Sequence, residues 1–338
     1  MDQRKVMSLG RSSLVVSLPK HWVKSNALKQ GDVVSMAVQR DRSLVVFPGV
    51  ERKKKSKKIT LHVDPKKPEV TVVRSIIACY LNGYSGIRLV SKGIFSVAQQ
   101  KAIRRIVRVL YMRIMESEVK TMYIQTLIDE SKASVVSSVR RMHLISSSMC
   151  RDAFNSLKDR DATLARAIYT LDDDVDHFSF FLLRLLRSAA LDTALANQLE
   201  LMPIDCLDYQ TLVHRIEHVA DHATNIAKNV IMLEGKNQEI SDPTLELILT
   251  AGDTAFTSYN KAVEAFFSKR VESSDEIIEE QKRVEKTDSN IASKSFQTEK
   301  NALIICATCS IRDSIKRIAE YAADIAEITI NQSYKSAL

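Results

Sequence analysis

Helix-breaking residues are scarce in most of this sequence. Of its eight glycines and six prolines, six glycines and four prolines stand at or before Gly93. The last 245 residues hold only Pro203, Gly235, Pro243 and Gly252. Because proline and glycine interrupt helices, this long stretch is predicted to be mostly α-helical.

Other absences exclude whole classes of protein. No uncharged apolar stretch approaches the roughly 18 residues of a membrane span, and no apolar run follows the basic N-terminus, so neither an integral membrane protein nor a secretion signal is indicated. Five cysteines, an odd number in 338 residues, do not resemble a disulfide framework, and we expect a cytoplasmic protein. The Cys306-x-x-Cys309 pair lies in an apolar helical run and is predicted to pack in the core.

Motifs of enzymes are missing as well. The sequence has no Gly-x-Ser-x-Gly, no Walker-type loop, no Gly-x-Gly-x-x-Gly and no Glu-x-x-His pair of the kind that di-iron carboxylate oxidases use. No covalent nucleophile or nucleotide site is therefore predicted, and the chain is not expected to be an enzyme.

Charge, by contrast, is abundant and unevenly distributed. The net charge is +8, but residues 1–130 hold 25 Lys and Arg against 10 Asp and Glu, whereas residues 131–338 hold 24 against 31. Such asymmetry indicates two tasks, a basic part that meets a polyanion and an acidic part that meets cations or another kind of partner.

The first 50 residues are predicted to form a small β domain. Two hairpin patterns flank a short helix: strands at 6–9, 14–18, 33–38 and 44–47, with the helix at 20–26. A segment this small buries too little apolar surface to be stable alone, so we expect a homodimer that shares one core. Residues 51–58 follow as a basic linker. It is either a solvated tether or an arm whose Lys53, Lys54 and Lys55 contact nucleic-acid phosphates.

Residues 59–130 alternate strand and helix signals. The predicted elements are strands at 59–63, 87–90 and 119–127 and helices at 69–81 and 96–111. We interpret them as a βαβαβ module, to which the sequence assigns no role.

The remaining chain is predicted to form two tandem three-helix bundles, at residues 131–235 and 240–335. The six helices run approximately over 132–158, 161–192, 207–234, 243–270, 275–295 and 299–332. Residues 220–227 match residues 319–326 at four of eight positions, all of them alanine or isoleucine. This repeat indicates one bundle used twice, with a shallow alanine face that lets a neighbouring helix approach closely.

Two carboxylate pairs are candidate metal ligands. Asp172 and Asp176, and likewise Glu217 and Asp221, are spaced i, i+4 on one face of their helices. If the two helices are antiparallel neighbours, four carboxylates converge and require a cation such as Mg, Mn, Fe or Zn. The alternative is a solvated acidic face. The histidines His214, His218 and His222 form a stripe on the same helix. They are either metal ligands or a polar edge of the helix.

Residues 10–22 (GRSSLVVSLPKHW) and 28–34 (LKQGDVV) resemble the AbrB/MazE-type swapped-hairpin domain of the SpoVT-AbrB kind. The resemblance implies an intertwined dimer whose basic faces contact double-stranded DNA. By position, it implies that Arg4, Arg11, Lys20 and Lys24 contact the DNA.

Residues 214–227 (HRIEHVADHATNIA) resemble the PhoU helix, and Asp172-x-x-x-Asp176 resembles that family's partner motif. The resemblance implies carboxylate-bound metal and a role in phosphate homeostasis, and the whole arrangement is similar to the archaeal fusion of an AbrB-like domain to PhoU. In the second repeat, Lys316 and Gln281 stand where Glu217 and Asp172 stand in the first. We therefore expect a weaker second site, formed by Glu285, Glu320 and Asp324.

These features together predict a dimeric, DNA-binding transcriptional regulator of phosphate uptake. Its metal-binding helical half is expected to be a sensor or regulatory module, with phosphate or a protein of phosphate transport or signalling as its partner. The alternative is a PhoU-like adaptor that regulates a phosphate transporter or a sensor kinase by protein contact, with the N-terminal domain serving mainly dimerisation.

Overall fold

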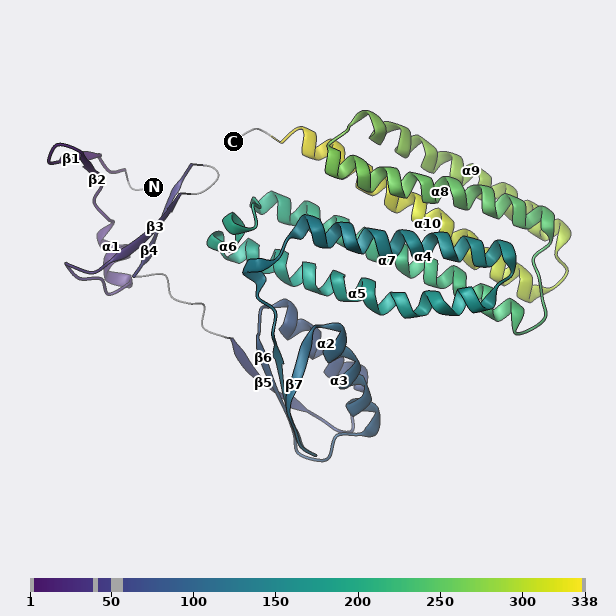
Figure 1. Cartoon of the computed structure of the whole chain (residues 1–338), viewed down its shortest axis with the longest axis horizontal. Helices are drawn as coiled ribbons and strands as arrows, with labels where there is room; N and C mark the ends of the chain where they lie inside the picture. The colour runs from purple at the N-terminus through teal and green to yellow at the C-terminus, as the bar shows by residue number, and fades with distance from the viewer. Residues whose placement is uncertain (1–2, 39–41, 50–56, 336–338) are drawn as a thin grey trace. The chain divides into compact units, whose positions relative to one another are not determined.

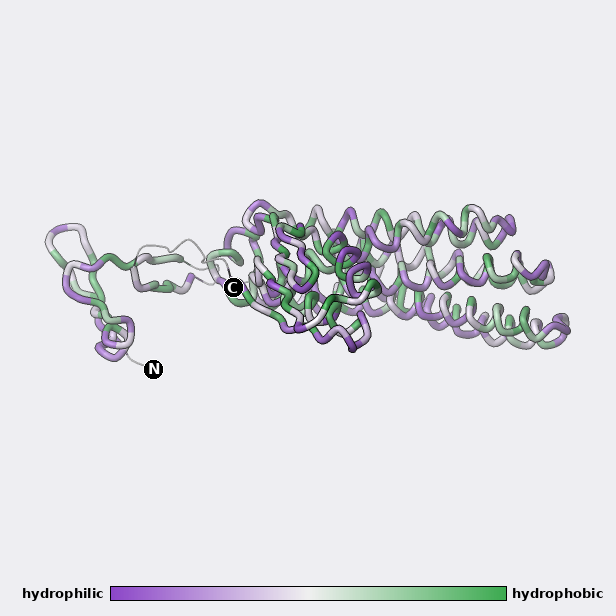
Figure 2. Tube along the Cα trace, turned by 90° about the horizontal axis from the view of Figure 1, so that it is seen from below, coloured by the Kyte–Doolittle hydropathy of each residue, from purple (hydrophilic) through white to green (hydrophobic). Residues whose placement is uncertain are grey.

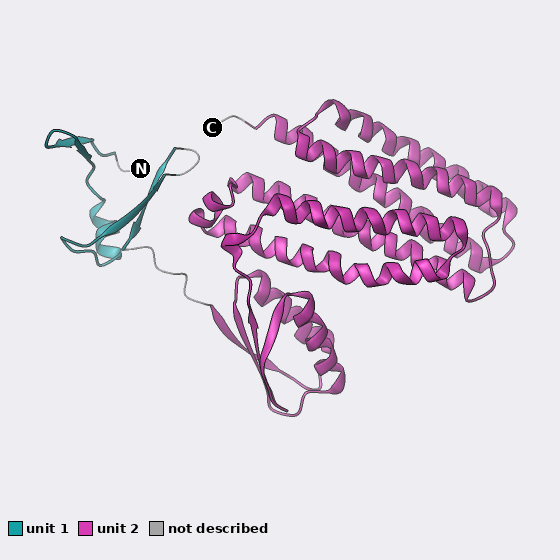
Figure 3. Cartoon of the chain, viewed as in Figure 1, with its two compact units in different colours: residues 1–55, 338 teal, residues 56–337 magenta. Residues whose placement is uncertain are grey.

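The computed structural model describes residues 3–38, 42–49 and 57–335. Its contacts divide the chain into two compact units, one of residues up to Lys55 and one from Ser56 onward (Figure 3). The second unit contains a small α/β module and a large helical bundle (Figure 1). The predicted class is confirmed: a β-hairpin region, a middle module of strands and helices, and a mostly helical C-terminal half.

The N-terminal unit consists of two hairpins and one short helix. Its elements are β1 (Met7–Leu9), β2 (Ser13–Val15), α1 (Lys20–Ser25), β3 (Val34–Val38) and β4 (Leu44–Pro48). Strands β1 and β2 pair antiparallel, as do β3 and β4, in two separate two-stranded sheets. None of the described residues between 3 and 49 is buried, so within one chain this unit has no core.

The middle module is one strand larger than the sequence indicates. It runs β5 (Lys58–Val63), α2 (Glu69–Leu81), β6 (Gly86–Ser91), α3 (Val97–Val109), β7 (Met112–Ser117) and β8 (Thr121–Thr126), with strand order β5-β6-β8-β7. Strands β5 and β6 are parallel, and β8 pairs antiparallel with both β6 and β7. The predicted βαβαβ pattern is therefore βαβαββ, because α3 ends at Val109 and Tyr111, at φ 51°, turns the chain into β7.

One face of this sheet packs against α2 and α3 (Figure 1). Ile87, Leu89 and Ile124 of the sheet are fully buried there. A capping box formed by Ser96 and Gln99 starts α3. The Gln99 side chain also donates hydrogen bonds to two carbonyl oxygens of the β5–α2 loop, at 2.9 Å each, so the helix start and this loop are fixed together.

The helical half has the six predicted long helices and one short one. They are α4 (Val135–Asp159), α5 (Ala162–Leu191), α6 (Thr193–Gln198), α7 (Pro203–Glu234), α8 (Asp242–Ser268), α9 (Glu272–Thr298) and α10 (Ala302–Ser333). Helices α4, α5 and α7 pack together, and so do α8, α9 and α10. Hydrophobic and hydrophilic residues alternate along these helices (Figure 2), and the apolar positions form one continuous core.

Small residues join the two bundles. The alanines of the repeated segments in α7 and α10 are buried where these helices pack. Asn225 of α7 donates to Ser310 and Ser314 of α10 at 3.0 and 2.9 Å. Between α4 and α8, a Cβ atom on Gly252 would lie 2.4 Å from the Phe154 ring, so only glycine permits this close approach.

A buried arginine fastens the middle module to the bundle. Arg184 of α5, with 5% of its side chain exposed, pairs with Glu130 at 2.7 Å. Its guanidinium also donates to the carbonyl oxygens of Tyr80 and Tyr84, at 2.5 and 2.9 Å. The end of α2 and helix α5 are thereby linked by charge-assisted bonds.

The prediction that Cys306 and Cys309 pack in the core is wrong, because both are exposed on α10. The buried residues are the two between them, Ala307 and Thr308, so the i, i+3 cysteines lie on the outer side of the helix. No helix among the described residues is long and apolar enough to cross a membrane.

Candidate functional site

The first-bundle carboxylates lie on two helices that pack side by side. Asp172 and Asp176 belong to α5, and Glu217 and Asp221 belong to α7. Thr224, one turn beyond Asp221, donates its hydroxyl to Asp172 at 3.2 Å. The contact between α5 and α7, which is needed to bring the two carboxylate pairs together, is therefore present.

The charges of these carboxylates act on one another. Burial, followed by the neighbouring charges of Asp172 and Asp221, raises the pKa of Asp176 to about 7. Burial, followed by Asp221 and Asp176, raises the pKa of Glu217 to about 7. Burial and then Asp172 raise the pKa of Asp221. Like charges this close in a half-buried site favour either a bound proton or a bound cation.

Nearby basic groups offset this cluster only in part: the charge of Arg105 lowers the pKa of Asp176, and those of His218 and Lys228 lower the pKa of Asp221. Among the described residues, no ion pair involves Asp172, Asp176 or Asp221, and Glu217 has only His218, at 3.5 Å. The neighbouring Asp173 is the exception and pairs with Arg105 of α3 at 2.7 Å. A set of carboxylate oxygens without cationic partners fits a hard divalent cation by its chemistry.

The side chains do not close around one point. Within the described part of the chain, no three His, Cys, Asp or Glu side chains are arranged to hold a metal ion. The four predicted ligands are thus brought within electrostatic range of one another, and their role as metal ligands stays a prediction.

The second bundle differs in a way that bears on the predicted weaker site. Asp324 pairs with Arg215 of α7 at 2.7 Å, and Glu320 pairs with Arg317 at 2.7 Å. Glu285 accepts a hydrogen bond from Gln281 at 2.7 Å. All three carboxylates are therefore engaged within the protein, although by arginines and a glutamine rather than by Lys316.

The histidine stripe of α7 packs against aromatic rings. The rings of His218 and His222 lie 5.3 and 5.8 Å from that of Tyr321 of α10. Burial is the largest cause of the lowered pKa values of His214 and His222. The Nδ1 atom of His218 is buried without a hydrogen-bond partner.

The predicted DNA contacts lie in the N-terminal unit and are exposed. Arg4 precedes β1, Arg11 lies in the turn between β1 and β2, and Lys20 and Lys24 lie on α1. Lys53, Lys54 and Lys55 lie outside the described residues.

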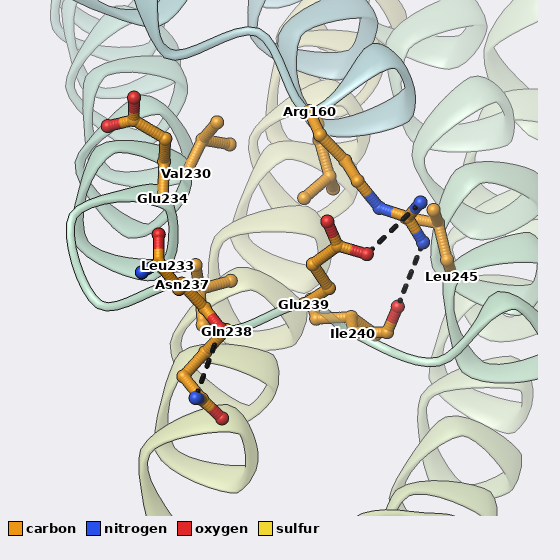
Figure 4. A pocket seen from close by; sticks show the side chains of 10 residues that line it. Arg160, Val230, Leu233, Glu234, Asn237, Gln238, Glu239, Ile240 and Leu245 are labelled. Atoms are coloured by element: carbon orange, nitrogen blue, oxygen red, sulfur yellow. Dashed lines mark hydrogen bonds and ion pairs between the residues drawn. The ribbon is translucent and has the colours of Figure 1, made fainter.

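Sequence reasoning missed Arg105 and Thr224, which contact the acidic segment of α5. It also missed a cavity of about 220 Å³ beside the α7–α8 connection. Figure 4 shows Arg160 reaching across it to Glu239 and to the carbonyl oxygen of Ile240. Arg160 also pairs with Asp242 at 2.8 Å. Its charge is thus paired within the protein, and none of the predicted site residues lines this cavity.

Comparison with known proteins agrees with this arrangement. Residues 139–230 and 248–329 match the model of the PhoU domain, and residues 8–59 match the model described as antidote-toxin recognition MazE, bacterial antitoxin. No curated protein matches the chain.

Two solved structures resemble the helical half. The crystal structure of PhoU from Pseudomonas aeruginosa has 19% sequence identity and a TM-score of 0.52, covering 59% of this chain and 95% of that one. The phosphate transport system regulatory protein PhoU from Streptococcus pneumoniae has 16% identity and a TM-score of 0.48, covering 60% and 95%. At 19% identity, the likeness to the Pseudomonas aeruginosa structure concerns the fold alone.

Proposed function

Because the chain belongs to the PhoU family, we propose that it is a regulator of phosphate uptake that binds double-stranded DNA as a homodimer. PhoU and MazE-like domains are regulatory rather than enzymatic families. The observation that carries the proposal is their combination in one chain, a PhoU-type bundle preceded by a basic MazE-like unit. The N-terminal unit binds the operator, and the helical half sets the response.

The N-terminal unit supports both parts of this proposal. Residues 1–58 hold 14 Lys and Arg against 4 Asp and Glu, a charge suited to a phosphate backbone. Large apolar side chains of the unit are exposed in the single chain, Leu14 at 76% and Val38 at 70% among them. A second copy would cover them and supply the core that one copy lacks.

The helical half supplies the regulatory site in this proposal. Asp172, Asp176, Glu217 and Asp221 would hold one or more divalent cations, of Mg, Mn, Fe or Zn. The bound cation would supply the positive charge that these carboxylates lack within the protein. Occupancy would then change the electrostatic balance at the contact between α5 and the middle module, where Arg105 meets Asp173. Phosphate, or a protein of phosphate transport or signalling, is the expected effector of this half.

The DNA-binding proposal is tested with the full chain by fluorescence anisotropy on genomic promoter fragments over a range of salt concentrations. Replacing Arg4, Arg11, Lys20 and Lys24 with Gln is expected to weaken binding and to flatten the dependence of log K on log[salt]. Each lost phosphate contact lowers that slope by about 0.9.

The matched control replaces four exposed lysines of the helical half with Gln: Lys158, Lys236, Lys286 and Lys300. It changes the net charge equally and is expected to retain both affinity and slope. A wild-type protein that dimerises and binds no DNA would reject this proposal in favour of the adaptor, which acts on a transporter or kinase by protein contact.

A further inference from the structure

The middle module is the most basic folded part of the chain outside the N-terminal unit. Residues 58–126 hold 12 Lys and Arg against 4 Asp and Glu, so this module alone carries as much excess positive charge as the whole chain. The module's core is apolar and lies between the sheet and helices α2 and α3, and its ion pairs include those of Arg88 with Glu116 and of Arg105 with Asp173. The charge therefore lies on the module's surface.

Four of these cations form a stripe on α3. Lys101, Arg104, Arg105 and Arg108 are spaced i, i+3, i+4 and i+7, and all four are exposed. This spacing puts them on one face of the helix, over a length of about 10 Å. The opposite face carries the buried Ile103, Ile106 and Val107. The stripe is thus the solvent-exposed face of an amphipathic helix, and the opposite face packs in the core of the module.

Most of the stripe has no acidic partner. Arg105 is held by Asp173 of α5, whereas Lys101, Arg104 and Arg108 make no ion pair with any described residue. Arg104 reaches only the hydroxyl of Ser117, at 3.4 Å. Four cations within two turns repel one another, and a polyanion relieves this repulsion while releasing its own counterions.

We propose that the exposed face of α3, through Lys101, Arg104 and Arg108, is a second binding surface for double-stranded DNA that contacts the phosphate backbone. This proposal rests on the proposed function, since the DNA is the one held by the N-terminal unit. The middle module then extends the footprint beyond the operator half-sites and adds affinity without sequence preference, because phosphate contacts position a protein and do not read bases.

Charge complementarity selects this occupant over an apolar partner. Every exposed residue of α3 from Lys101 to Arg108 is a lysine or arginine. The exposed apolar side chains near this helix lie at its two ends or in the β7–β8 turn, and they include Ile94, Val97, Tyr111 and Val119. An anionic membrane surface is the competing occupant, since it would use both the cations and these apolar side chains.

The test compares full-length variants on one promoter fragment. The K101Q/R104Q/R108Q triple variant keeps the helix-forming character of each position and alters no buried residue, so its circular dichroism and melting should match the wild type. Affinity at about 0.1 M salt is expected to fall at least about tenfold, with the salt slope lowered by about 2 to 3 for each protomer that contacts the DNA. The loss should be equal on promoter and unrelated fragments. The K236Q/K286Q/K300Q control removes the same charge from the helical half and should change neither quantity.

The outcomes separate the two proposals. Failure of the wild type to bind any DNA would reject the proposed function. Binding by the wild type, lost in the R4Q/R11Q/K20Q/K24Q variant but unchanged in affinity and slope in the triple variant, would reject the α3 surface alone. If the triple variant keeps its DNA affinity and instead loses binding to phosphatidylglycerol vesicles, the surface serves a membrane and the proposal is wrong.

Discussion

At the residue scale, the acidic cluster has a measurable consequence for stability. A carboxyl group whose pKa is raised in the folded state holds its proton more tightly there than in the unfolded chain. This tighter proton binding stabilises the folded state, and the stabilisation is complete at pH values below the unfolded pKa of about 4. It is lost as the pH rises through the folded pKa. For Asp176 and Glu217, whose folded pKa values are about 7, this window runs from about pH 4 to pH 7.

We therefore expect the metal-free protein to melt at a lower temperature at pH 8 than at pH 5.5, and the E217Q variant to lose less over the same interval. The amide of Gln is neutral at both pH values. The melting temperature of the variant minus that of the wild type should therefore increase as the pH rises. The measurement is thermal unfolding in the presence of a chelator. E285Q, on the exposed outer part of α9, is the control. A melting-temperature difference between E217Q and the wild type that does not change with pH would contradict this prediction.

Individual contacts were only partly predictable from the sequence. The i, i+4 spacing of Asp172 and Asp176 placed them on one face, since helical periodicity is a local property. The partner of Asp173 was not predictable, because Arg105 lies 68 positions away in another part of the fold. Cys306 and Cys309 were assigned to the core from an apolar run, but their i, i+3 spacing puts both on the side of α10 that faces outward.

At the scale of elements, the two bundles are copies with different electrostatics. The four candidate ligands on α5 and α7 form no ion pair with an arginine among the described residues, whereas in α10 Glu320 and Asp324 each have an arginine. A carboxylate that is already paired with a guanidinium has its charge compensated and attracts a metal ion less strongly. We therefore expect the first bundle to be the better cation site, for a reason more direct than the Lys316 that the sequence suggested.

Metal content of purified variants should show this asymmetry. Replacing Asp176 and Asp221 with Asn is expected to remove most of the bound metal, because two of four oxygen donors lose their charge. Replacing Glu285 and Glu320 with Gln should remove little. Elemental analysis after dialysis against each candidate metal measures both, and circular dichroism verifies the fold. Equal losses from the two double variants would show that the bundles bind metal alike.

The elements themselves were predictable where their signals are long and local. The six long helices follow from the scarcity of glycine and proline, and the start of α8 from Ser241 followed by Pro243 at its first turn. Two short elements were missed. Strand β7, Met112–Ser117, has one buried residue and mixed charges, so it lacks a clear alternation. Helix α6 has six residues, fewer than two turns, which is too short for a periodic pattern.

At the scale of the whole molecule, the order of the domains along the chain follows from composition. Composition does not show how the N-terminal unit obtains the core that it lacks in a single chain. The basic β region, the middle module and the repeated bundles were visible as changes in charge, in glycine and proline content and in periodicity. The structure adds that Arg184 ties the middle module to α5, whereas none of the described residues between 3 and 49 is buried. A unit of this kind is marginal by size alone, and its exposed strands present unpaired apolar surface.

Dimerisation through this surface is therefore expected to depend on side chains that the single chain leaves exposed. Leu14 and Met36 are 76% and 64% exposed, and the L14S/M36S variant should sediment as a monomer at micromolar concentration where the wild type is a dimer. Burial of each such side chain contributes about 1.5 to 3 kcal/mol, and the change removes one from each hairpin of both copies. The helical signal should persist, since the bundle has its own core. L144S/L191S, at equally exposed positions of α4 and α5, removes as much apolar surface from the bundle. If this control dissociates the dimer and L14S/M36S does not, the contact between copies lies on the bundle instead.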